Sequence, residues 1–227
     1  MSEEISLGVE KEEAPKRKGR GPVTFKIKLS DEQKRAKEVA IENIVTVFRG
    51  KAGSSKTTLI ANIALDLFIK RQYGKIIFIR PTVEAGNTSL GFLPGCEEDK
   101  MAPYIRPLKE AMYALREREE IDAMFQKNKI EILPIQFARG LNIRDTIICI
   151  DEAQNMSVPE LELITSRICD NTKVLISMDA NQIDIKKYDS CAHVIDKIKV
   201  LDGVEIFELT ENFRHRLAVE ITDTLNK

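Results

Sequence analysis

The segment from Gly50 to Thr57 constrains this chain more than any other part of its 227 residues. It reads Gly-Lys-Ala-Gly-Ser-Ser-Lys-Thr and joins a short β-branched apolar run at residues 44–48 to a helical pattern at 56–71. Such a turn suits phosphate, because small residues let backbone N–H groups curl around it and the helix N-terminus adds partial positive charge. An ordinary Gly/Ser turn is the competing interpretation. The context favours a phosphate-binding loop.

Within this loop each residue type has an expected task. We expect the nucleotide to contact Gly50, Lys51, Ala52, Gly53, Ser54, Ser55, Lys56, Thr57 and Thr58. Lys56 would neutralise the β- and γ-phosphates during catalysis, and the Thr57 hydroxyl would hold Mg²⁺. Ser55 stands where such loops usually have a glycine before the lysine, a departure that bears on phosphate geometry and on the rate of hydrolysis.

A pair of acids follows the apolar run at residues 146–150. In an open α/β sheet, ligands bind at the carboxyl ends of the strands, where Asp151 and Glu152 stand. Asp151 would order the Mg²⁺ shell, and Glu152 would orient and deprotonate an attacking water. The pair alone could simply begin a solvated helix. About one hundred residues after a phosphate loop, it is the expected second half of a hydrolytic site.

Three further polar residues are candidates. Gln182 follows the run at 174–178 and would contact the γ-phosphate or the water, while Arg214 follows the run at 204–209 and would stabilise transition-state charge. Either could instead belong to a solvated turn. Gln33 would read the adenine edge through its amide. The alternative for Gln33 is a plain capped helix, with Ser30 or Asp31 as the cap.

The remaining pattern alternates strands with helices. Expected strands lie at 44–48, 75–79, 129–135, 146–150, 174–178 and 204–209, and expected helices at 56–71, 103–125, 159–168 and 190–200. This alternation predicts a three-layer α/β/α fold around a mainly parallel sheet, in one domain spanning residues 23–227. Residues 1–22 are acidic and then basic with little to bury, so we expect a disordered leader.

Composition removes several classes of protein. The formal net charge of -1 gives no global basicity that would indicate nucleic acid. No apolar run approaches the ~20 residues needed to cross a bilayer, and the start of the chain lacks the layout of a signal peptide. The four scattered cysteines favour free thiols in a reducing compartment. We therefore expect a cytoplasmic protein.

The order of these motifs resembles that of superfamily 1 helicases, and the segments between them resemble the PhoH-like ATPases. The latter resemblance rests on residues 80–86, 90–95, 103–108, 137–140 and 151–155, and it covers roughly residues 29–220. Three departures are Ser55 in the loop, Phe137-Ala138 before Arg139, and Met178 before Asp179. The resemblance implies a RecA/helicase-like P-loop fold, ATP and Mg²⁺ as cofactors, and RNA or single-stranded nucleic acid as partner.

The length of the chain leads to an expectation about its oligomeric state. A helicase lobe normally faces a second lobe, and this chain has length for one, so we expect a homo-oligomer, a ring such as a hexamer. A neighbouring subunit would then supply an arginine. The candidates for it are Arg106, Arg139, Arg214 and Arg216. The Gly/Pro-rich loop at 84–95 and the aromatic rings of Phe92 and Tyr104 are candidate contacts to a nucleic-acid strand.

Three functions remain open on the sequence. The leading one is an ATPase that binds or remodels nucleic acid, an RNA helicase among the options. The second is a nucleotide-binding switch in which Ser55 attenuates turnover and the chain acts through protein partners. The third is a small-molecule kinase, against which the acid pair and Gln182 argue because they suit attack by water.

Overall fold

A computed structural model of the chain describes residues 23–81, 97–141, 143–179, 182–183, 185 and 190–225, with the backbone alone at 97–104, 136, 222–223 and 225. The expected leader, the loop at 84–95, Phe92 and the ring of Tyr104 lie outside what is described, as does Cys96. Cys149 and Cys191 are buried free thiols.

Six strands form one sheet in which every hydrogen-bonded neighbour is parallel, in the order β3-β2-β4-β5-β1-β6. The strands are β1 (Val45–Gly50), β2 (Lys75–Arg80), β3 (Ile130–Pro134), β4 (Thr146–Ile150), β5 (Thr172–Met178) and β6 (Val204–Leu209). All six predicted strands are present. Because β5 separates β1 from β4, the end of β5 lies between the loop after β1 and the acids after β4.

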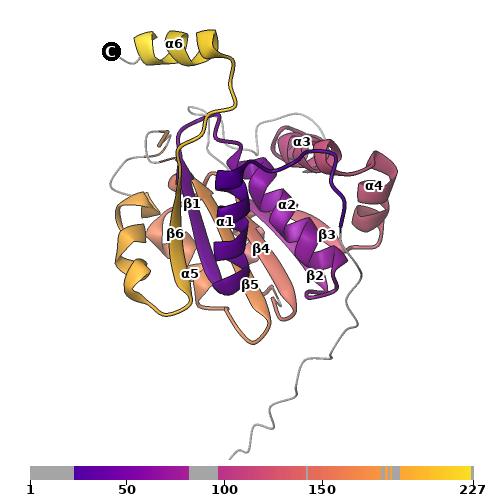
Figure 1. Cartoon of the computed structure of the whole chain (residues 1–227). Helices are drawn as coiled ribbons and strands as arrows, with labels where there is room; N and C mark the ends of the chain where they lie inside the picture. The colour runs from indigo at the N-terminus through magenta and orange to yellow at the C-terminus, as the bar shows by residue number, and fades with distance from the viewer. Residues whose placement is uncertain are drawn as a thin grey trace, which may run out of the picture.

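Helices cover both faces of the sheet, which is why β4 and β5 are buried along their whole length (Figure 1). One face is covered by α1 (Asp31–Glu42), α2 (Lys56–Ile69), α3 (Glu97–Leu115) and α4 (Arg118–Gln126). The other face is covered by α5 (Val158–Thr165) with the short 3₁₀ helices η2 (Ile135–Ala138), η3 (Ala153–Asn155), η4 (Cys191–His193) and η5 (Ile195–Val200). The fold is the expected three-layer, RecA/helicase-like P-loop architecture.

The structure adds detail to two helix predictions. The expected helix at 103–125 is two helices, because Glu117 takes an extended backbone and starts α4 as its N-cap. The helix expected at 190–200 is present in the 3₁₀ form: the segment forms η4 and η5, with i→i−3 hydrogen bonds such as Lys197 N–H to the Val194 carbonyl. β-branched Val194, Ile195 and Ile198 disfavour the α-helix, and the tighter turn still packs them on the sheet.

Helix starts follow the local sequence more closely. Ser30 caps α1 and Ser157 caps α5, each in a capping box, and the proline after Val158 occupies the first turn of α5. After β6 the chain continues into α6 (Arg216–Leu225), which lies away from the sheet (Figure 1). Among the described helices none has the length and apolar character to span a membrane.

Candidate nucleotide-binding site

The loop between β1 and α2 has a backbone that only small residues allow. A Cβ on Gly50 would lie 2.8 Å from Ser54 Oγ and 2.9 Å from the Leu209 carbonyl oxygen, and Gly53 has a φ of +93°. Ser55 itself takes the left-handed conformation, φ 58° and ψ 31°, and makes no side-chain capping bond to α2. Ser55 therefore reproduces the glycine-type backbone at a cost in strain.

Lys56, the first residue of α2, turns its side chain back over the loop. Its Nζ donates to the Gly50 carbonyl at 2.7 Å and the Lys51 carbonyl at 3.1 Å. Burial lowers the pKa of Lys56, an effect that the nearby carboxylates of Asp179 and Glu152 oppose. The ammonium therefore sits inside the curl of the loop, where a phosphate would compete with the carbonyls for it.

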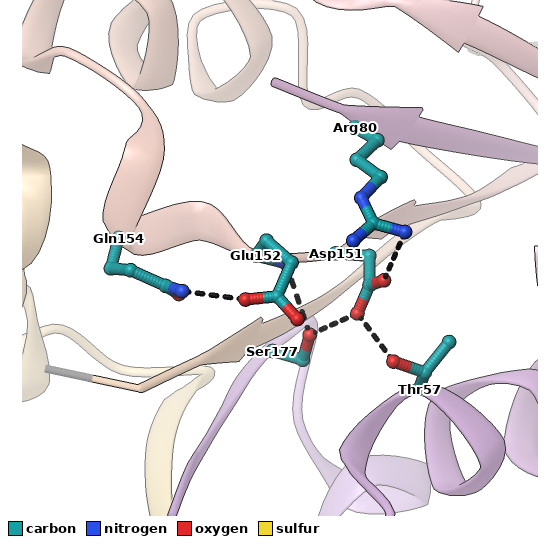
Figure 2. Close-up of polar contacts among 6 residues, drawn as sticks. All are labelled: Thr57, Arg80, Asp151, Glu152, Gln154 and Ser177. Atoms are coloured by element: carbon teal, nitrogen blue, oxygen red, sulfur yellow. Dashed lines mark hydrogen bonds and ion pairs between the residues drawn. The ribbon is translucent and has the colours of Figure 1, made fainter. Parts of the chain in front are cut away.

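The predicted metal ligands meet. Thr57 Oγ1 donates to Asp151 Oδ1 at 2.9 Å, and the hydroxyl of Ser177, near the end of β5, donates to the same oxygen at 2.6 Å (Figure 2). Asp151 Oδ2 is buried without a hydrogen bond, and the Arg80 guanidinium lies 3.8 Å from it. A hydroxyl beside a buried carboxylate whose second oxygen makes no hydrogen bond fits Mg²⁺, which binds through few protein ligands and keeps the rest for phosphate and water.

Glu152 occupies a strained position beside this pair. Its backbone is left-handed, with φ 58° and ψ 42°, and its Oε2 accepts a hydrogen bond from Gln154 Nε2 at 2.5 Å (Figure 2). Gln154 is fully buried and its Oε1 accepts the Asp179 N–H at 3.0 Å. The Gln154 amide thus links Glu152, the expected base, to Asp179 in the turn that follows β5. Gln182 belongs to the same turn, because its N–H donates to the Asp179 carbonyl at 3.0 Å.

A cavity of about 340 Å³ joins the loop to the other predicted catalytic residues. It is lined by Ala52, Gly53, Ser55, Lys56, Thr57, Thr58, Glu152, Gln182, Phe213 and Arg214. All four predicted catalytic side chains are thereby brought together. Gly50, Lys51 and Ser54 belong to the loop but do not line the cavity, and neither does Asp151, which accepts the hydrogen bond from Thr57.

The other candidates fall elsewhere. Gln33 is buried in the capping box of α1, where its Oε1 accepts the Ser30 N–H at 3.1 Å, so an adenine contact would rest on its amide nitrogen. Arg106, Arg139 and Arg216 are exposed and outside the cavity lining, whereas Arg214 lines it from the same chain.

Sequence reasoning missed Ser177, Gln154 and Arg80 as site residues. Gln154 lies within residues 151–155, which carry part of the family resemblance, and Arg80 is a charge at a strand end, so both carried a signal. Ser177 did not, because a serine in the apolar run of β5 resembles any small core residue.

Comparison with known proteins identifies the family of this chain. The family model described as PhoH-like protein matches residues 26–226. The chain belongs to the PhoH-like protein family. Among curated relatives, a PhoH-like protein of Mycobacterium tuberculosis is 35% identical over 195 residues, covering 84% of this chain and 55% of the relative. One from Bacillus subtilis is 34% identical over 182 residues, covering 78% and 57%. The chain thus spans about half the length of these relatives.

Solved structures agree on the fold. The large terminase of a thermophilic bacteriophage superposes with a TM-score of 0.58 at 10% identity, over 88% of this chain and 51% of the terminase. A second structure of that terminase, described as a complex with ADP, gives a TM-score of 0.51 at 10% identity, covering 88% and 50%. At this identity the likeness shows a shared P-loop architecture.

Proposed function

We propose that the chain binds ATP with Mg²⁺ and hydrolyses it. The observation that carries the proposal is the cavity in which Lys56, Glu152, Gln182 and Arg214 meet from four separate segments. The Thr57–Asp151 hydrogen bond beside it supplies the hydroxyl and carboxylate that a metal–nucleotide complex needs. The phage terminase described with ADP shares this architecture, which supports a nucleotide as ligand.

Each side chain has a task in that reaction. Lys56 exchanges its loop carbonyls for phosphate oxygens and neutralises them. Bound Mg²⁺, held by Thr57 and Asp151, would offset charge on the β- and γ-phosphates. Glu152 accepts the proton of the attacking water, and Gln182 orients that water against the γ-phosphate. Arg214 stabilises the charge that develops on the transferred group.

The backbone of Ser55 favours turnover over the switch alternative. Ser55 holds the left-handed conformation that a glycine would take, and its side chain forms no capping bond that would reshape the loop. The loop therefore keeps the backbone conformation that a glycine would give it, which supports turnover despite the substitution. The attenuated switch remains the second candidate because the Ser55 side chain lines the cavity.

RNA or single-stranded nucleic acid is the partner we propose, with helicase-type remodelling as the coupled work. The resemblance of the motif order to superfamily 1 helicases motivates this part, and the position of Arg139, which follows η2 directly after β3 at the carboxyl edge of the sheet, supports it. We also propose a homo-oligomeric ring in which Arg106, Arg139 or Arg216 of a neighbour approaches the nucleotide. Light scattering with ATP and Mg²⁺ that shows only monomer would contradict the ring.

One experiment separates these alternatives. Steady-state phosphate release is measured with and without single-stranded RNA, for the parent and for Lys56→Ala. The proposal expects turnover that RNA stimulates and that Lys56→Ala abolishes. Nucleotide binding by the parent without turnover would support the switch, whereas a measurable rate that is equal for the parent and Lys56→Ala would refute the site.

A further inference from the structure

Glu32, in the first turn of α1, has a buried carboxylate with an unusual set of partners. Its Oε1 accepts the Thr210 N–H at 2.9 Å and the Thr210 hydroxyl at 2.6 Å, and its Oε2 accepts the Glu211 N–H at 3.1 Å. Glu32 as a whole residue is 7% exposed. Acidic side chains are rarely buried this far unless their oxygens are paired, so these bonds account for its position.

The carboxylate is held in its ionised form. Burial alone would raise the pKa of Glu32, but the hydrogen bonds from Thr210 and Glu211 outweigh burial and leave the pKa below its ordinary value. An ionised carboxylate accepts at both oxygens, which is what three donors on two successive residues require. Glu32 therefore fastens α1 to the exit of β6.

The next three residues, 212–214, pack against the phosphate loop. The Phe213 N–H donates to the Gly53 carbonyl at 2.9 Å, and Asn212 Nδ2 donates to the Ala52 carbonyl at 3.3 Å. Asn212 Oδ1 accepts the Arg214 N–H at 2.9 Å. A Cβ on Gly53 would lie 2.5 Å from Asn212 Oδ1 and 2.7 Å from Arg214 Cγ, so the segment and the loop are in direct contact.

We propose that Glu32 is a positioning residue for Arg214, acting through the exit of β6. The carboxylate sets where residues 210–211 leave the sheet, the contacts of Asn212 and Phe213 carry that position onto the loop, and Arg214 reaches the cavity as a result. This inference rests on the proposed function, because it is a claim about Arg214 during hydrolysis.

Glu32→Gln tests the link with little change in shape. The substituted amide keeps one oxygen but presents N–H groups as its other arm, and a donor would then face the Thr210 or Glu211 donors. Asp31→Asn is the matched control, since Asp31 is the adjacent carboxylate, is exposed, and pairs with Lys34 of its own helix at 2.7 Å.

The readout is a double-mutant cycle on kcat and KM for ATP, with Glu32→Gln, Arg214→Ala and the combined variant. We expect Glu32→Gln to lower kcat about tenfold with KM changed less than about threefold, the pattern of a lost transition-state interaction. The combined variant should be no slower than Arg214→Ala, and Asp31→Asn should match the parent. Effects of Glu32→Gln and Arg214→Ala that multiply, or a parental rate for Glu32→Gln, would overturn the inference.

A second variant covers the case in which Glu32→Gln does not fold, and two further results separate failure of the positioning role from failure of the proposed function. If Glu32→Gln does not fold, Thr210→Val removes one of the three bonds and should lower kcat in the same direction by a smaller factor; an unchanged kcat there overturns the inference. If Lys56→Ala and Arg214→Ala both hydrolyse ATP at the parental rate, the proposed function fails. If only Glu32→Gln departs from expectation, the positioning role alone fails.

Discussion

Replacing Ser55 with glycine should stabilise the protein. A left-handed backbone costs an L-residue about 1–2 kcal/mol, and Ser55, with φ 58°, bears that cost. Glycine removes the cost but adds about 0.5–1 kcal/mol of backbone entropy in the unfolded chain. No capping bond of Ser55 is lost. The two ranges leave a net gain of about 0–1.5 kcal/mol, and its centre of about 0.75 kcal/mol raises Tm by about 2–3 °C in a domain of this size.

Differential scanning calorimetry without nucleotide measures the shift, and phosphate release measures its effect on chemistry. Because the loop already holds the glycine-type geometry, we expect hydrolysis by Ser55→Gly to stay within about threefold of the parent, a change of about 0.7 kcal/mol in barrier. Arg71→Gly is the control for the strain argument. Arg71 also has a left-handed backbone, with φ 60° just after α2, but it does not line the cavity. A lower Tm for Ser55→Gly would refute the strain argument, and a gain in turnover above about tenfold would establish Ser55 as an attenuator.

Other predictions follow from single contacts. Gly53→Ala should weaken ATP binding at least about tenfold in a calorimetric titration, because the new Cβ would clash with Asn212. Gln154→Ala should lower kcat about tenfold with little change in KM, since Glu152 loses the amide that orients it. Lys173→Met should destabilise the fold by about 2–3 kcal/mol in urea unfolding, because Lys173 Nζ caps three carbonyls at the end of α1.

The difference in free energy of unfolding between the parent and Lys173→Met should also depend on pH. Burial lowers the pKa of Lys173 from 10.5 to about 8, so between these values the unfolded chain binds more protons than the folded one. The free energy of unfolding of the parent should therefore rise relative to Lys173→Met as pH increases through this window. A difference that stays flat from pH 8 to 10.5 would show that Lys173 titrates normally.

Local signals were enough to predict the strands, the phosphate loop and the acid pair, because each is encoded within a few successive residues. The meeting of Lys56 and Glu152 also followed, since the carboxyl ends of parallel strands share one edge. The capped start of α1 was equally local, although the sequence left Ser30 and Asp31 open as the cap and the structure has Ser30.

What stayed hidden depends on tertiary contacts or on fine backbone geometry. Glu32 and its partner Thr210 lie 178 residues apart, so no local pattern links them. Ser177 matters only because β5 is placed between β1 and β4 in the sheet. Periodicity near residue 195 indicated a helix but could not distinguish the 3₁₀ form, whose apolar spacing differs little over two turns.

The most direct test of the central claim pairs binding with turnover in Glu152→Gln. Nucleotide affinity is measured by titration with ATP and Mg²⁺, and hydrolysis by single-turnover phosphate release on the same preparation. The site geometry predicts that Glu152→Gln binds ATP as the parent does yet hydrolyses it at least about 100-fold more slowly, the usual loss of a general base. Hydrolysis at the parental rate would contradict the assignment of Glu152 and, with it, the site as described.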